Sequence, residues 1–364
     1  MSRAVITGIG CVGPHGVGRE ALASALEEGS SLGKPERIGT LRGRSLEIAV
    51  ARVAPFERDR FIPSRKRRRM GEVSQIWVTC CLLAREDAGL AQEPGSDPRI
   101  PPERRGTYVG TGFGCIDITW NYLVGLYRDG PGMANPYLFS ESVANAPAGH
   151  SAIELDTRGP TITFTCGDAS TASALQFAAR GIRSGRVEMA YCGGVEMLSQ
   201  PLLRVLASLG SMDFAGEGGV CFLLESLPRA RARGARIYAE VVGSGAASDP
   251  VASPTEWSRD PEPVRAALAG AAALAECEIR KVFLHACRSP RAEEAERLAV
   301  NATLPGVETA QTSSIFGTLA AAGGFNLAAA ALEASRPDYR GSAVMVNASS
   351  WGGGVYCLAL RGAP

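Results

Sequence analysis

An aspartate at a predicted turn between a strand and a helix constrains this chain more than any other feature. The β-branched run at 161–165 predicts a buried strand. Apolar residues then recur at helical spacing from about 168 to 184, and Gly185 ends that helix. Because a helix start leaves backbone N–H groups unpaired, we expect the side chain of Asp168 to lie among hydrogen-bond donors.

Asp168 has two interpretations. Aspartate is a frequent N-cap, so it can simply begin the helix. The same strand–turn–helix geometry also exposes nucleophiles, and a cysteine here would have a lowered pKa beside an oxyanion hole. The helix dipole stabilises a carboxylate by roughly 0.3–2 kcal/mol, but a carboxylate accepts acyl groups poorly. Cys166 is the nearest substitute nucleophile, and its position in the strand pattern predicts that it is buried.

Motifs along nearly the whole chain carry a family resemblance. Their order and spacing together resemble the β-ketoacyl synthase family of condensing enzymes, in which the active-site cysteine falls at the position of Asp168. The matching segments are Ala4–Gly10, Arg67–Met70, Asp87–Leu90, Val109–Gly112, Asn145–Gly149, Gly159–Pro160, Ile182–Gly185, Gly193–Glu196, Gly216–Gly218, Arg233–Arg236 and Asn347–Gly353.

The resemblance also implies that most of the catalytic signature is missing. The first catalytic histidine of the family matches His285, whereas its lysine and second histidine match Ser313 and Thr318. Decarboxylative condensation needs a thiolate to carry the acyl chain and paired donors to stabilise the enolate. With Asp168 at the cysteine position, one donor remains, so we expect no condensation by this chain alone.

Among such proteins, the chain is similar to the chain length factors of type II polyketide synthases, including aryl-polyene systems. The resemblance implies a heterodimer with a catalytic ketosynthase, whose acyl tunnel this subunit would shape, and an acyl carrier protein as a further partner. Residues 112–122 match the stretch that reaches the dimer interface in that group. The candidate tunnel residues are Cys115, Ile118 and Tyr122, at i, i+3 and i+7 of one helical face, together with Phe139 and Trp351. The alternative is that this face packs inside its own subunit.

The pattern of elements predicts an α/β fold. Strand signals occur at 3–8, 106–110, 161–165, 188–193, 219–224, 237–242, 281–284 and 343–347, and helical signals at 18–27, 70–88, 168–184, 261–274, 291–300 and 318–334. The chain restarts near Ile237, which suggests halves at 1–236 and 237–364. The resemblance implies a thiolase-like fold, with two pseudo-repeated halves in five α-β-α-β-α layers.

Composition excludes several other functions. The 364 residues are 45% hydrophobic with a formal net charge of +1, which gives no electrostatic case for nucleic acid or membrane binding. No apolar stretch of membrane-spanning length and no signal-peptide layout is present, so we expect a cytoplasmic protein. The ten cysteines are scattered and lack C-x-x-C spacing, which predicts free thiols and no metal site. We expect no cofactor.

Two further motifs have competing interpretations. Gly8, Gly10 and Gly13 match a dinucleotide-binding fingerprint, but no acidic residue follows at the required distance, which favours a tight turn between strand and helix. A short basic run fits either a solvated helix start or a docking site for an acidic acyl carrier protein. That run is Arg65, Lys66, Arg67, Arg68 and Arg69.

Two other classes of function remain open. The chain is an enzyme with displaced chemistry, an acyltransferase or a malonyl decarboxylase, if Cys166 or the hydroxyl of Thr318 replaces the missing groups. It is a binding or scaffold protein if it holds an acyl chain without a ketosynthase partner.

Overall fold

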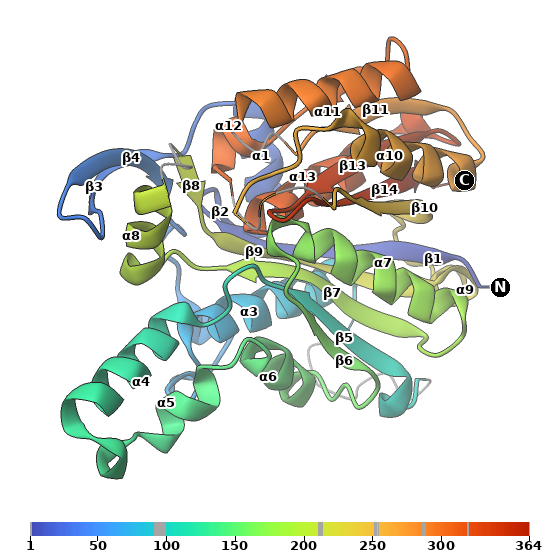
Figure 1. Cartoon of the computed structure of the whole chain (residues 1–364). Helices are drawn as coiled ribbons and strands as arrows, with labels where there is room; N and C mark the ends of the chain where they lie inside the picture. Colours follow the sequence, from blue (N-terminus) through green and yellow to red (C-terminus); the bar gives the residue numbers. More distant parts are fainter. Residues whose placement is uncertain are drawn as a thin grey trace.

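The strands form one large mixed sheet whose two halves share the same strand order (Figure 1). The computed structural model describes residues 2–90, 100–209, 214–250, 253, 255–285, 289–318 and 320–363. The order across the first half is β6 (Thr161–Phe164), β5 (Arg105–Gly110), β7 (Met189–Glu196), β9 (Gly218–Ser226) and β1 (Ala4–Gly13). Across the second half it is β12 (Glu308–Ala310), β11 (Ile279–Phe283), β13 (Ala343–Ser349), β14 (Gly354–Gly362) and β10 (Ala239–Ser248).

The two halves are a structural repeat. When the strands of each half are numbered along the chain, both halves have the spatial order 3-2-4-5-1. The three outer strands of each half are parallel to one another, and the two inner strands are antiparallel to their neighbours. The halves join through a short antiparallel pairing of β1 with β10. This agrees with the predicted pseudo-repeat, while the boundary at residue 236 stays a prediction.

Paired glycines explain how a helix packs closely on the innermost strand of each half, β1 in the first and β10 in the second. A Cβ added at Gly8 or Gly10 would lie about 2 Å from a carbonyl oxygen of α3 (Glu72–Asp87), at 2.0 and 2.1 Å. Gly243 and Gly245 of β10 approach α10 (Pro261–Ala275) in the same way, at 2.1 and 2.0 Å. The predicted tight turn at Gly8 and Gly10 is therefore wrong, because both lie inside β1, where they admit a helix.

Helices complete five layers around the two half-sheets (Figure 1). The α3 helix and α6 (Ala146–Glu154) cover the outer face of the first half, and α10 and α11 (Pro290–Thr303) cover the outer face of the second. Two helices lie between the halves and contact both each other and the strands, namely α7 (Ser170–Arg183) and α13 (Ala320–Ala334). These central helices bring the loops that precede them into the middle of the molecule.

The remaining elements surround this core. A small sheet orders β3 (Lys34–Gly39), β4 (Ser45–Ala51) and β8 (Phe214–Gly216), and β2 (Gly16–Val17) pairs with β1. The other helices are α1 (Arg19–Glu28), α2 (Ser64–Arg67), α4 (Ile116–Asp129), α5 (Pro136–Glu141), α8 (Gln200–Leu209), α9 (Leu227–Ala232) and α12 (Ser313–Phe316). Short 3-10 turns occupy 58–60, 102–104, 131–133, 167–169 and 337–339. No described helix has the length and apolar character needed to cross a bilayer.

One strand, β6, lies at a different place in the sheet from the one that its sequence pattern predicts. The pattern at 161–165 predicts a buried strand, but β6 is the outermost strand of its half, and its first two residues are exposed. The β-branched run gave the correct element but not its position, because periodicity does not distinguish a central strand from an edge strand.

Candidate functional site

A single hydroxyl holds the turn that ends β6 and begins α7. Ser170 Oγ accepts a hydrogen bond from the Cys166 N–H at 2.8 Å, and it lies 2.6 Å from the Gly167 carbonyl and 3.1 Å from the Thr111 carbonyl. Gly167 has φ +56°, a left-handed conformation that favours glycine. A Cβ at Gly167 would also lie 2.5 Å from Ser350 Oγ. The turn therefore fixes the next side chain, that of Asp168.

Asp168 is buried at the start of the central helix and faces His285. Its side chain is 9% exposed, and Asp168 Oδ2 lies 3.7 Å from His285 Nε2. Glu296 Oε1 accepts hydrogen bonds from the His285 backbone N–H, at 2.8 Å, and from the Asn347 amide. The two residues that the sequence placed 117 positions apart thus meet between the half-sheets, where Glu296 holds the loop that carries His285.

A cavity of about 370 Å³ opens beside Asp168. Its aromatic wall continues into the protein, because the Trp351 ring packs edge-on against Phe113 and Trp257, with centroids 5.9 and 5.3 Å apart. The lining residues come from the loop after β5, the turn before α7 and the strands of the second half, and they are Gly112, Phe113, Thr165, Cys166, Gly167, Asp168, Ser248, Ser350, Trp351, Gly352, Gly354 and Tyr356.

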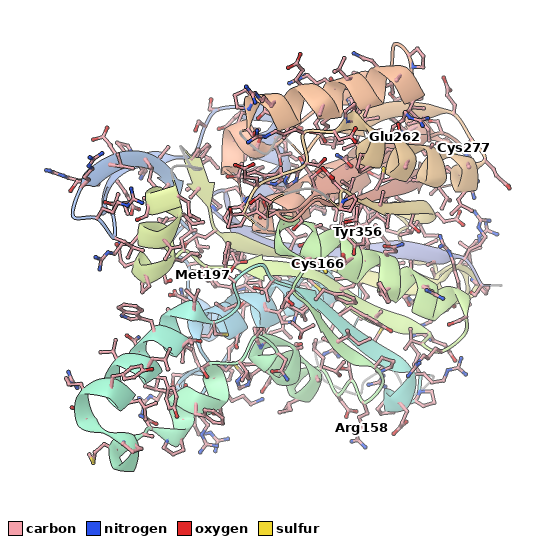
Figure 2. The ribbon with its side chains drawn as sticks, viewed as in Figure 1. Arg158, Cys166, Met197, Glu262, Cys277 and Tyr356 are labelled. Atoms are coloured by element: carbon pink, nitrogen blue, oxygen red, sulfur yellow. The ribbon has the colours of Figure 1, made fainter. Side chains whose placement is uncertain are left out.

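Cys166 lines this cavity, contrary to the prediction that it is buried in the strand. The strand ends at Phe164, and the Cys166 side chain is partly exposed. Figure 2 labels Cys166 and Tyr356, which line the same cavity. Burial is the main cause that raises the pKa of the Tyr356 phenol, and the adjacent Cys166 thiol raises it further.

Glu196 is a second buried carboxyl group near Asp168. Its Oε2 atom accepts hydrogen bonds from the backbone N–H groups of Gly112, at 2.7 Å, and Phe113, at 3.1 Å, whereas Oε1 has no partner among the described residues. Burial raises the pKa of Glu196 to about 8, the backbone donors oppose this shift, and the charge of Asp168 adds to it. Glu196 therefore holds the loop that carries Phe113 while keeping its proton at neutral pH. In the sequence Glu196 stands out only as part of a motif, although a carboxyl group that ends an apolar strand was a usable signal.

Of the other two degenerate catalytic positions, Thr318 contacts the small sheet and Ser313 begins α12. The Thr318 hydroxyl and backbone N–H both donate to the carbonyl of Phe214, at 3.1 Å each. Ser313 is buried at the first residue of α12. Neither is among the described residues that line the Asp168 cavity. The Thr318 hydroxyl is thus already engaged in holding β8.

The predicted tunnel residues fall into three environments. Cys115 and Ile118 are buried in their own subunit, in a cluster with α3, so for them the alternative interpretation fits. Tyr122 packs its ring against the exposed Phe139, with centroids 5.7 Å apart. Trp351 lies instead at the Asp168 cavity. The structure therefore brings Trp351 together with Asp168 and leaves Tyr122 and Phe139 on the arm formed by α4 and α5.

The basic run lies on and after the short α2 helix. Arg65, Lys66, Arg68 and Arg69 are exposed, and Arg67 is partly exposed. Two of the five residues form ion pairs, Lys66 with Glu154 at 2.6 Å and Arg67 with Asp59 at 2.9 Å. The Arg68 carbonyl accepts a hydrogen bond from the Tyr137 hydroxyl at 3.0 Å, so the run adjoins the α4–α5 arm.

Comparison with known proteins gives the family. Residues 1–229 match the model of the β-ketoacyl synthase N-terminal domain, and the chain therefore belongs to the β-ketoacyl synthase family. A 3-oxoacyl-[acyl-carrier-protein] synthase 2 of Vibrio cholerae is 27% identical over 354 residues, which cover 88% of this chain and 83% of that protein. The synthase of the same name from Coxiella burnetii is 28% identical over 268 residues, 68% of this chain but only 63% of that protein, less than two thirds of its length.

Solved structures share the fold over the whole chain. The ishigamide ketosynthase/chain length factor has a TM-score of 0.85 and 24% identity, with complete coverage of both chains. A ketosynthase in complex with its chain length factor from Xenorhabdus doucetiae has a TM-score of 0.82 and 18% identity, covering 100% of this chain and 98% of that one. The predicted thiolase-like α/β fold is thereby confirmed.

Glu196→Gln should remove a loss of stability at alkaline pH. The folded protein holds the Glu196 proton up to a pKa of about 8, whereas the unfolded chain releases it near the ordinary value of 4.5. This component of stability is present below pH 4.5 and is lost as the pH rises through about 8. Urea unfolding at pH of about 6 and about 9 should show that the wild type loses roughly 1–3 kcal/mol more than Glu196→Gln.

Glu47→Gln, at an exposed carboxylate of β4, is the matched control and should behave as the wild type does. Equal pH dependence of the wild type and Glu196→Gln would show that Glu196 is ionised at neutral pH.

Proposed function

We propose that this chain is a non-catalytic ketosynthase-like subunit, a chain length factor, that pairs with an active ketosynthase and shapes its acyl tunnel. The observation that carries the proposal is Asp168. The resemblance assigns this position to the nucleophilic cysteine of the family, and here a carboxylate faces His285 at 3.7 Å. A carboxylate neither carries an acyl chain as a thioester nor gives a stable acyl intermediate, so the chain needs a partner that supplies the thiolate.

The changes at the other two positions support the same proposal. Enolate stabilisation requires donors aimed at the developing oxyanion. The hydroxyl of Thr318 instead donates to the carbonyl of Phe214, and neither Thr318 nor Ser313 is among the described residues lining the Asp168 cavity. Removing one preorganised donor typically costs about 10²–10³ in rate. Of the donors that the family uses, His285 remains.

An exposed sheet edge supports pairing with a related subunit. The β6 strand ends its half-sheet, and the apolar side chains beside this edge are unusually exposed, with Ile162 at 38% and Phe177 at 43%. The rings of Phe164 and Phe177 pack together with their centroids 5.0 Å apart, and this contact joins the sheet edge to α7. An unprotected strand edge with apolar neighbours favours association with another strand.

The α4–α5 arm offers a second apolar surface for the same partner. Four large side chains recur on α4 at helical spacing, and their exposed fractions run from 40 to 86%, at Trp120, Leu123, Val124 and Tyr127. Such a stripe on a helix normally faces a packed neighbour. We assign this stripe to the ketosynthase subunit, and Tyr122 with Phe139 to the floor of the partner's tunnel.

The acyl carrier protein would dock at the basic run. Arg65, Arg68 and Arg69 are exposed and make no ion pair among the described residues. An acidic carrier surface complements such a patch, which speeds encounter more than it increases affinity.

A second candidate function follows from Cys166. This residue is partly exposed and lines the cavity together with Tyr356, so an acyltransferase or malonyl decarboxylase with displaced chemistry has a nucleophile in place. Formation of an acyl adduct on Cys166 and turnover of a malonyl thioester by the single chain would favour this function over the chain length factor.

Asp168→Cys should not restore condensation. The new thiol, at a helix N-terminus, is partly activated by the dipole and should become acylated. The enolate still lacks its donors, so elongation should stay at least about 10²-fold below that of an active synthase. Mass spectrometry detects the acyl-enzyme, and a malonyl-carrier assay measures elongation.

The matched control is Asp168→Asn, which removes the charge without adding a nucleophile and should give neither acylation nor elongation. Elongation by Asp168→Cys at the rate of an ordinary ketosynthase would make the aspartate a single lesion in a working enzyme.

Tyr122→Ala should lengthen the products of the paired complex. The substitution removes a ring that packs on Phe139 at the surface of the arm. Ile118→Trp is unsuitable as a second test, because Ile118 packs so closely on Gly71 that a Cβ built at Gly71 would lie 2.4 Å from the Ile118 side chain. Tyr127→Ala is the control on the same helix, because this 86% exposed ring belongs to the partner-facing stripe. It should weaken pairing without changing product length. Unchanged products with Tyr122→Ala would remove this residue from the tunnel.

A further inference from the structure

A buried carboxylate attaches the α4–α5 arm to the layered core. Figure 1 shows α4 and α5 extending away from that core. Glu141 is the last residue of α5, and it is only 5% exposed. On this six-residue helix Leu138 and Glu141, three positions apart, face the core, whereas Phe139 is 58% exposed. One short helix therefore carries both the attachment and one of the proposed tunnel residues, on different faces.

Both oxygens of this carboxylate are engaged by other helices. Glu141 Oε1 lies 2.8 Å from Nε2 of His150, in α6, and Glu141 Oε2 accepts a hydrogen bond from the backbone N–H of Gly71 at 3.0 Å. Gly71 immediately precedes α3, so the negative charge also lies at the N-terminus of that helix, where the helix dipole favours it. We call these contacts of Glu141 with His150 and Gly71 the arm joint.

Both helices of the arm meet the core at Gly71. A Cβ built at Gly71 would lie 2.4 Å from Ile118 of α4, on the same residue whose N–H binds Glu141 of α5. The hydroxyl of Tyr137 adds a hydrogen bond from α5 to the carbonyl of Arg68 at 3.0 Å, but Tyr137 is 39% exposed. A hydrogen bond in contact with water stabilises less than one to a buried charge. The joint is thus the stronger polar attachment of α5.

The charge of Glu141 strengthens the joint. Burial raises the pKa of the Glu141 carboxyl, but the hydrogen bonds from His150 and Gly71 together lower it by more, so the carboxyl is ionised at neutral pH. Hydrogen bonds to a charged acceptor are roughly twice as strong as those between neutral groups. Removing the carboxylate would also leave the imidazole and the Gly71 N–H without their acceptor, which costs further free energy.

We propose that Glu141 is a positioning residue, whose joint fixes where the Tyr122–Phe139 ring pair lies and thereby the length of the acyl chain that the paired complex holds. The consequence for product length rests on the proposed function, which assigns these two rings to the partner's tunnel. The joint itself belongs to the single chain, so it is tested without a partner.

Hydrogen–deuterium exchange on the full single chain tests the joint. Glu141→Ala should speed exchange in residues 131–142 at least about tenfold, because both bonds to the carboxylate are lost, while residues 76–84 of α3 keep their wild-type rates. Glu141→Gln should exchange nearly as the wild type does, since its amide can accept from Gly71 and donate to a neutral imidazole. Ser140→Ala, at the exposed neighbouring position of α5, is the matched control and should also behave as the wild type does.

His150→Ala is a second test of the joint from α6. It leaves Glu141 with one of its two partners, so exchange in residues 131–142 should rise at least about threefold. This variant keeps the proposal testable even if Glu141→Ala fails to fold.

Product length in the paired complex tests the consequence. With Glu141→Ala the share of the major product should fall at least about twofold while neighbouring lengths rise, because a loosely held arm no longer places the ring pair in one position. Glu141→Gln and Ser140→Ala should keep the wild-type distribution. A merely structural role would lower the melting temperature of Glu141→Ala without changing the product lengths.

Unchanged exchange in both Glu141→Ala and His150→Ala would overturn the proposal, and so would a more mobile arm with unchanged products. Failure of the chain to pair with a ketosynthase would contradict the proposed function alone, because the exchange rates of the single chain already decide whether the joint holds the arm.

Discussion

The turn held by Ser170 is the constraint on which the site depends. Its hydroxyl joins the backbone of Cys166, Gly167 and Thr111, so the end of β6, the start of α7 and the loop after β5 meet at one atom. Since α7 lies between the half-sheets, this turn puts Asp168 at the centre of the fold, opposite the loop of the second half that carries His285. The pseudo-repeat is therefore what assembles the site.

Two buried carboxyl groups then determine the chemistry. Glu196 organises the loop that carries Phe113, and Asp168 borders the cavity, with mutual repulsion that contributes to the raised pKa of Glu196. Like charges in a low-dielectric interior are tolerated only if one group is protonated. Such a pair does not suit a site that must stabilise a new anion during condensation.

Much of the fold could be predicted from the sequence, because the strands of the first half and the long helices carry strong periodicity. The helix predicted at 70–88 is α3, at 72–87, and the helix predicted from 168 begins two residues later, after a 3-10 turn. The β3 strand of the small sheet was missed because it is mostly polar and exposed, with Ile38 as its one buried residue. The last strand, β14, was missed because it follows a glycine-rich loop.

The site was predictable residue by residue but not as a cavity. Asp168 and His285 were expected together and do meet. The positions of the predicted tunnel residues depend on long-range packing, which the sequence pattern does not reveal. Trp351 lines the same cavity as Asp168, whereas Cys115 and Ile118 are buried in the core of their own subunit. The exposure of Cys166 also depended on where β6 ends, which a run of β-branched residues does not reveal.

The central claim is that this chain acts through a partner, and reconstitution tests it most directly. The chain is purified alone and after co-expression with a candidate ketosynthase from the same organism, and each preparation is given an acyl primer and malonyl carrier protein. We expect no elongation by the single chain, and elongation by a co-purified heterodimer that depends on the partner's cysteine. Elongation by the single chain, or a stable monomer that co-purifies with no ketosynthase, would contradict it.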